Sequence, residues 1–239
     1  MLIDNWPLLG LRLNTPRLEL RLPSGEELAE LADLAAVGVH EPDRMPFSVP
    51  WTDLPPTERA RSVVQHHWLR LGNWAPDDWA LNLAVFEQGR IVGLQTIAAR
   101  NYAAVREVST GSWLGLRHQG RGIGTEMRAA VLHLAFAGLD AAEATSGAFI
   151  DNPSSFRVST KLGYEPDGVE RLVVRDRVTV LRRLRISRAR WEAHRNTEVS
   201  ISNLTPCLPL LGLPDRTPDR SGTVGPSPLP LEGEDGVGC

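Results

Sequence analysis

The stretch Arg117–Thr125 (RHQGRGIGT) has the residue types of a phosphate-binding loop. It follows a strand-like segment, Glu107–Leu116, and precedes Thr125–Ala137, whose apolar residues recur at helical spacing. The first N–H groups of a helix lack internal partners and the helix dipole favours an anion there, while glycine lets the anion come close. This order of elements predicts a phosphate site, although a glycine cluster taken alone is equally typical of a plain turn.

A strand, a glycine loop and a helix also begin a dinucleotide-binding unit. Two features argue against that unit. The spacing Gln119-x-x-Gly122-x-Gly124 is not Gly-x-Gly-x-x-Gly, and the loop lies in the middle of the chain, after several expected strands.

A second motif follows about thirty residues on, at Asn152–Tyr164 (NPSSFRVSTKLGY). Asn152 precedes Pro153, which suits the first turn of a helix, so a helix N-cap is one role for this side chain. Ser155 carries a hydroxyl in the same turn. A bland role for Ser155 is a hydrogen bond within its own turn.

The two motifs in this order resemble the GNAT acyltransferase superfamily, and the second resembles its RimJ/RimL branch. The opening Thr15–Arg21 (TPRLELR) is similar to the first strand of that branch. The segments His40–Trp51 and Gly111–Leu116 are similar to actinobacterial members, some of which use succinyl-CoA. The resemblance covers about residues 11–195.

The resemblance implies an α/β (α+β) fold, with a mixed, mostly antiparallel central sheet whose central strands are splayed and flanked by helices. It implies that acyl-CoA, with acetyl-CoA or succinyl-CoA as donor, lies in the gap. The pyrophosphate would be held by the loop, chiefly by its amides, and the pantetheine would lie along the strand edge and near the second motif. The implied donor-binding residues are Trp113, Leu114, Gln119, Gly120, Arg121, Gly122, Ile123, Gly124, Thr125, Asn152 and Ser155.

Acyl transfer to an amine needs a neutral amine, a polarised thioester and a proton for the thiolate. The resemblance places Ser155 near the sulfur, where it would donate a proton or a hydrogen bond, with Tyr164 as the second candidate acid. Relatives often carry a carboxylate where this chain has Ser109. Glu107 lies two residues earlier and shares its strand face, so it is the candidate base, with an exposed strand-end glutamate as the alternative.

The acceptor is expected near the proline-rich segment His40–Pro56, which is too rich in proline for a regular element. Arg44 would pair with a carboxylate of the acceptor or of a succinyl donor, or with a neighbouring acidic residue. The candidate acceptor residues are His40, Arg44, Phe47 and Trp51.

Composition narrows the function classes. A net charge of −3 gives no reason to expect nucleic acid, and no apolar run approaches a membrane span. The first residues lack a secretory pattern and the two cysteines, Cys207 and Cys239, lie late in the chain, so a reducing cytoplasmic location is expected. The histidines are scattered, and the pair His66 and His67 has no carboxylate partner at helical metal-ligand spacing, so no metal is expected. A homodimer is an option because dimers are the commonest soluble oligomers.

The expected organisation is a GNAT domain over residues 1–195, an apolar extension over 196–214 that packs on it, and a disordered tail over 215–239. Patterning and turn signals predict an edge strand, a helix capped by Ser24 and Glu27, and a helix capped by Thr57. They also predict two hairpins, a short buried strand and a last helix. The edge strand is expected over 11–22 and the two capped helices over 24–34 and 57–71. The hairpins are expected over 79–100 and 169–186, the short buried strand over 142–150 and the last helix over 188–194.

The preferred function is acyl-CoA-dependent transfer of an acetyl or succinyl group to the primary amine of a small molecule or protein. The first alternative is a non-catalytic CoA-binding or regulatory module, suggested by Ser109 in place of the usual carboxylate. The second alternative is the dinucleotide-binding fold, which predicts nicotinamide or flavin binding.

Overall fold

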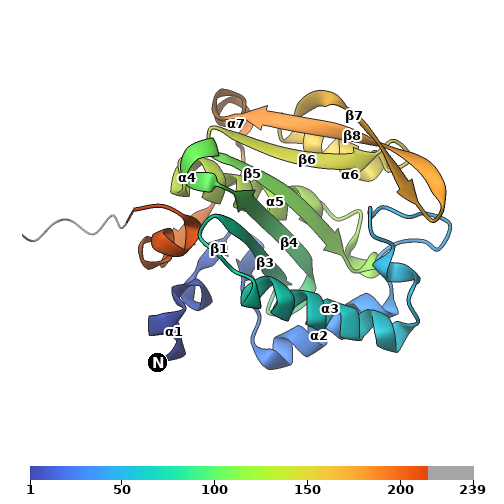
Figure 1. Cartoon of the computed structure of the whole chain (residues 1–239), viewed down its shortest axis with the longest axis horizontal. Helices are drawn as coiled ribbons and strands as arrows, with labels where there is room; N and C mark the ends of the chain where they lie inside the picture. Colours follow the sequence, from blue (N-terminus) through green and yellow to red (C-terminus); the bar gives the residue numbers. More distant parts are fainter. Residues whose placement is uncertain (215–239) are drawn as a thin grey trace, which may run out of the picture.

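The structure is a computed structural model that describes residues 1–214. Within these residues nine strands form one sheet in the order β7-β8-β6-β5-β4-β3-β2-β1-β9 (Figure 1). Every named pairing is antiparallel except that of β5 with β6. The strands are β1 (Arg12–Asn14), β2 (Leu18–Arg21), β3 (Asp78–Glu87), β4 (Arg90–Arg100), β5 (Glu107–Leu114), β6 (Glu143–Phe149), β7 (Glu165–Val174), β8 (Arg177–Ser187) and β9 (Ser200–Ser202).

Helices lie on both faces of the sheet. The α-helices are α1 (Leu2–Asn5), α2 (Gly25–Val37), α3 (Pro56–Gly72), α4 (Tyr102–Val105), α5 (Ile123–His133), α6 (Pro153–Lys161) and α7 (Arg188–His194). Short 3₁₀ turns are η1 (Pro7–Gly10), η2 (Trp51–Asp53), η3 (Leu116–His118) and η5 (Thr205–Leu211), and α5 continues into a π-helical turn, η4 (Leu134–Gly138).

Alternation along β3 explains how the two faces are covered. Ala84 and Phe86 pack with the buried leucines of α2, whereas Leu83 and Val85 belong to the larger core that includes α5. Successive strand side chains point to opposite faces, so both faces of β3 must be buried. The helices α2 and α3 therefore cover one face and α5 covers the other, as Figure 1 shows.

The predicted edge strand over 11–22 is wrong in two respects. The segment forms two strands, β1 and β2, because Pro16 cannot donate to a ladder and Thr15 instead turns the chain by accepting from the Leu18 amide. Neither strand is an edge, since β1 pairs with β9 and β2 with β3. The sheet ends at β7 and β9.

The other predicted elements are present with shifted ends. Ser24 and Glu27 form the predicted capping box of α2. Thr57 does not cap α3, which begins one residue earlier, at Pro56, because proline at the first helical position needs no N–H partner. Within 196–214, η5 packs with Leu208 and Leu211 buried, and Trp74 donates to the Leu210 carbonyl at 2.8 Å. The predicted tail, 215–239, lies outside the described residues.

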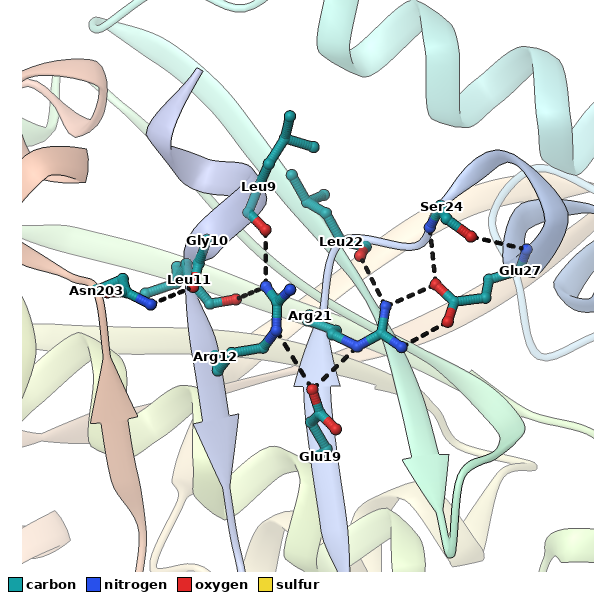
Figure 2. A network of polar contacts seen from close by, with 10 residues as sticks. All are labelled: Leu9, Gly10, Leu11, Arg12, Glu19, Arg21, Leu22, Ser24, Glu27 and Asn203. Carbon is teal, nitrogen blue, oxygen red and sulfur yellow. Dashed lines mark hydrogen bonds and ion pairs between the residues drawn. The ribbon is translucent and has the colours of Figure 1, made fainter. Parts of the chain in front are cut away.

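A polar network joins β1, β2 and the start of α2 (Figure 2). Glu27 accepts from the Ser24 amide at 2.8 Å and from both terminal nitrogens of Arg21, at 2.6 and 2.5 Å. Glu19 bridges Arg21 and Arg12, at 2.9 and 3.3 Å. The Arg21 side chain lowers the pKa of Glu27 to about 2, more than burial raises it.

Replacing Glu27 with Gln removes the bidentate ion pair and weakens the capping box, so we expect a loss of about 1–2 kcal/mol at pH 7. The folded-state pKa of Glu27 is depressed, so this stabilisation is present above about pH 4.5 and is lost as pH falls toward 2. Urea unfolding at pH 7 and pH 3 measures both effects. Glu30→Gln, on an exposed position of α2, is the control, and equal stabilities of wild type and Glu27→Gln at pH 7 would contradict this role.

Candidate active site

The central strands β5 and β6 pair over only three residues. Glu107–Ser109 pair in parallel with Glu143–Thr145, after which β5 continues against β4 and β6 against β8 (Figure 1). Two side-chain bonds cross next, from the Thr110 hydroxyl to the Thr145 carbonyl at 3.2 Å and from the Ser146 hydroxyl to the Thr110 carbonyl at 3.3 Å. Beyond them lies a cleft of about 1220 Å³, lined by residues of both strands.

The glycine loop lies at the open end of this cleft. Gly120 and Gly122 have φ of 73° and 83°, a region that favours glycine, and Gly122 is the N-cap of α5. Among the described residues, the amides of Gly120, Gly122, Ile123 and Gly124 have no hydrogen-bond acceptor. The Thr125 amide donates to the Gly122 carbonyl at 3.1 Å. The loop thus presents four free amides to an anion. Of the residues predicted to bind the pyrophosphate through the loop, Thr125 differs because its amide already has an acceptor.

Side chains around the loop hold its shape. The Gln119 amide nitrogen donates to the carbonyls of Val39 and Leu114, at 2.7 and 3.1 Å, so it fastens the loop to the end of β5. Arg121 pairs with Glu87 at 2.8 Å. Glu126, an acidic residue in the first turn of α5, is held by Arg17 at 2.6 Å, so its charge is compensated beside the free amides.

The start of α6 lies across the cleft. Asn152 caps α6 by accepting from the Ser155 amide at 3.1 Å, as its position before Pro153 predicts. Ser155 lines the cleft, and no hydrogen bond of its hydroxyl is found within the described residues. The hydroxyl is therefore free to bind a ligand. It does not form the hydrogen bond within its own turn that was the alternative role.

The structure does not bring Glu107 to the cleft. Glu107 lies where β5 and β6 are paired, and its carboxylate binds Arg185, which also binds Glu143 and, at 3.2 Å, Asp167. These bonds raise the pKa of Arg185. Ser109 lines the cleft and Glu107 does not, although they share a strand face. Ser109 is the last residue of β5 that pairs with β6, whereas Glu107 lies two residues further into the paired part.

Tyr164, the second candidate acid, is buried and its hydroxyl lies 3.1 Å from the Thr110 hydroxyl. Burial raises the pKa of its phenol. Its ring belongs to the main core and it is not among the residues that line the cleft.

Aromatic side chains line the cleft on the face covered by α2 and α3. Ring centroids are 5.9 Å apart for His40 and Phe47, 5.2 Å for Phe47 and Trp51, and 5.9 Å for Trp51 and Trp113. The His40 Nε2 atom lies 2.7 Å from the Thr52 hydroxyl. The structure thus brings together the predicted acceptor residues His40, Phe47 and Trp51, with Trp113 from β5.

Arg44 lines the same cleft and is exposed. Among the described residues, Arg44 forms no ion pair. The proline-rich segment that carries it is anchored at Asp53, whose carboxylate accepts from Arg175 Nε at 2.8 Å, at the tip of the β7–β8 hairpin. This contact holds the segment between the two halves of the sheet.

Two buried polar residues on this face were missed by the sequence analysis. His67 of α3 is 5% exposed and Asn82 of β3 is 3% exposed, and both line the cleft. Among the described residues, the Nδ1 atom of His67 and the Nδ2 atom of Asn82 have no hydrogen-bond partner. Buried polar atoms are normally paired, so both are candidates for contact with a ligand. In the sequence, His67 lies within the predicted helix over 57–71.

Within residues 1–214 no cluster of three or more His, Cys, Asp or Glu side chains is arranged to hold a metal ion. No helix in the same range has the length and hydropathy needed to cross a bilayer.

Diverging central strands, a helix that begins with free amides and a second helix with an unbonded hydroxyl together line one cleft of an α/β fold that suits an anionic ligand. The chain belongs to the GNAT acetyltransferase family, because the family model described as "Acetyltransferase (GNAT) domain" matches residues 17–165. The predicted fold class is thereby confirmed.

Solved structures share this fold. RimJ from Mycobacterium smegmatis in complex with CoA-disulfide is 18% identical, with a TM-score of 0.61 over 78% of this chain and 94% of that chain. RimL, a ribosomal-protein alpha-N-acetyltransferase in its apo form, is 19% identical, with a TM-score of 0.56 over 72% and 91%. A GCN5-related N-acetyltransferase from Brucella melitensis is 17% identical, with a TM-score of 0.61 over 76% and 80%.

The burial of His67 generates a prediction on stability. Burial, and secondarily the neighbouring His66, lowers the pKa of His67 to about 4. The unfolded chain takes up this proton near pH 6.5, so the stability present above that pH is lost as pH falls toward 4, by about 3 kcal/mol. Between pH 7 and pH 4.5, His67→Phe should lose less free energy of unfolding than wild type, as measured by urea unfolding. An unchanged pH dependence would contradict a buried, neutral imidazole.

Proposed function

We propose that this protein transfers an acetyl group from acetyl-CoA directly to a primary amine, with succinyl-CoA as the second candidate donor. The observation that carries the proposal is the cleft between β5 and β6, which has free amides at one end and the Ser155 hydroxyl on its wall. The family match supports acyl transfer from CoA to an amine.

The donor's pyrophosphate fits the amides of Gly120, Gly122, Ile123 and Gly124, where the dipole of α5 favours negative charge. The pantetheine arm fits the edge of β5 near Trp113 and Leu114, because β5 has no strand partner on its β6 side beyond Ser109. Gln119 and Asn152 shape the ends of this path through their bonds to the main chain.

The chemistry follows from positioning. The amine attacks the thioester carbon, and the C–S bond breaks with its electron pair on sulfur. Ser155 donates a hydrogen bond to the sulfur and passes it a proton, since it lines the cleft and its hydroxyl has no partner among the described residues. The proton that the amine nitrogen loses restores the Ser155 hydroxyl. A covalent acyl-enzyme is not needed, and Cys207, the cysteine within the described residues, is buried away from the cleft.

The acceptor enters from the aromatic side. Phe47, Trp51 and Trp113 offer flat apolar surface, and His67 and Asn82 offer polar contacts beneath it. The carboxylates that line the cleft are Glu41 and Asp151, against the cations of Arg44, Arg128, Arg157 and Lys161. This balance favours an acceptor with one amine over a polyamine.

The second candidate function is a CoA-binding module without turnover. The observation that favours it is that Glu107, the expected base, is bonded to Arg185 outside the cleft. Cytoplasmic location and a homodimer stay predictions of the sequence.

Release of free CoA thiol from acetyl-CoA and succinyl-CoA, measured with a panel of amines, separates the two functions. We expect turnover with a monoamine, and a fall in kcat of about 10- to 100-fold in Ser155→Ala with little change in donor KM, because a proton donor acts on the transition state. Ser154→Ala, in the same turn, is the matched control, since the Ser154 hydroxyl accepts from Arg157.

Donor binding without thiol release in the whole panel would favour the binding module. If neither CoA ester raised the thermal stability of the protein, both functions would be rejected, since a ligand at a hundredfold excess over its Kd stabilises by about 2.7 kcal/mol.

A further inference from the structure

Arg128 is a buried cation in the wall of the cleft. It comes from the middle of α5, is 4% exposed and lines the cleft. Its Nη1 atom donates to the Ser159 hydroxyl at 2.8 Å and its Nη2 atom to the Ser112 hydroxyl at 3.2 Å. Among the described residues its Nε atom has no partner, and no carboxylate lies within ion-pair distance.

An unpaired buried guanidinium is unusual. Its protonation does not change in proteins, so burial cannot be relieved by loss of the proton. Two neutral hydroxyls replace only part of its hydration, so the buried charge keeps a large desolvation cost without a counter-charge. The titratable group that acts on it is Tyr164, whose hydroxyl is bonded to Thr110 and stays neutral because burial raises its pKa. A ligand with negative charge at this point would remove the cost.

The position of Arg128 selects which part of the donor it meets. The free amides that suit the pyrophosphate lie at the start of α5, about 7 Å along the helix axis from Arg128. Ser112 belongs to the part of β5 that has left β6, and Ser159 lies one helical turn after Ser155. The Ser159 hydroxyl also donates to the Ser155 carbonyl at 3.2 Å. The guanidinium therefore spans the gap between β5 and α6, at the level of Ser155 rather than of the phosphates.

We propose that Arg128 is the charge partner of the leaving thiolate, an inference that rests on the acyl transfer proposed above. When the amine nitrogen bonds to the thioester carbon and the C–S bond breaks, the electron pair of that bond goes to sulfur. The negative charge on sulfur is then matched by the fixed guanidinium, which needs no reorganisation because Ser112 and Ser159 already hold it. The proton lost by the amine later converts the thiolate to the free thiol through Ser155.

The thiol of bound CoA gives a direct test. Thiolate absorbs in the ultraviolet where the thiol does not, so the pKa of the thiol of bound CoA can be titrated in wild type, Arg128→Met, Arg128→Lys and Arg177→Met. We expect this pKa to lie about one unit or more below that of free CoA in wild type, and at or above the free value in Arg128→Met. Arg128→Lys should be intermediate. Arg177→Met, which removes an exposed cation outside the cleft, should match wild type.

Kinetics add a second readout. In Arg128→Met, kcat with acetyl-CoA should fall by about 100-fold, with a smaller change in donor KM, because the charge acts on the transition state. Thermal unfolding shows whether Arg128→Met is folded. If it is not, Arg128→Lys and Ser112→Ala carry the test, since each displaces the positive charge without removing it.

Equal thiol pKa values in wild type and Arg128→Met, in a wild type that binds CoA, would overturn the role of Arg128 and leave the proposed function standing. A loss confined to succinyl-CoA would also overturn it, because Arg128 would then hold the donor's carboxylate. A wild type that binds no CoA would reject the proposed function and this inference together.

Discussion

The arrangement of the candidate site depends on how briefly β5 and β6 pair. Three residue pairs join the strands, and each strand then follows its other neighbour, β4 or β8. If the pairing continued, the edge of β5 and the hydroxyls near it would be covered by β6. Because it stops at Ser109 and Thr145, one sheet presents a strand edge, a helix start and the helix α6 to a single cleft.

Two arginines, on either side of the point where β5 and β6 stop pairing, have opposite surroundings. Arg185 lies where β5 and β6 are paired and binds three carboxylates, those of Glu107, Glu143 and Asp167. Arg128 lies in the open part and binds two neutral hydroxyls. Negative charge is thus concentrated where the strands are held together, and it is kept away from the buried cation that faces the cleft. A carboxylate beside Arg128 would stabilise the free protein, but it would also compensate the charge that a ligand is proposed to meet.

Local signals in the sequence predicted most of the fold and the local geometry of the glycine loop and of the Asn152 cap. The glycine loop and the Asn152 cap were found because their function depends on neighbours in the chain. Glu107 was misplaced because strand parity fixes a face but not a partner, and its partner Arg185 lies 78 residues away. The strand β9 was missed because three residues, Ser200–Ser202, are too short for an alternating pattern.

The sequence does carry a signal for Arg128. Arg128 lies three residues before Val131 on the expected helix Thr125–Ala137, so a charged residue interrupts its apolar face. His67 and Asn82 left no such signal, since a histidine on a helix and an asparagine in a strand are common. Their unpartnered atoms appear only once α3 is packed on β3.

The cations of the cleft explain how the reaction could proceed although Glu107, the expected base, lies outside the cleft. A primary amine reaches the enzyme as an ammonium ion, and it must lose a proton before it attacks. Burial and nearby cations both lower the pKa of an ammonium group. An amine bound in this cleft would meet both conditions, an aromatic wall and a fixed cation, Arg128. The same charge that stabilises a thiolate then also promotes release of the amine proton, so a strong carboxylate base is less necessary than in a cleft of opposite charge.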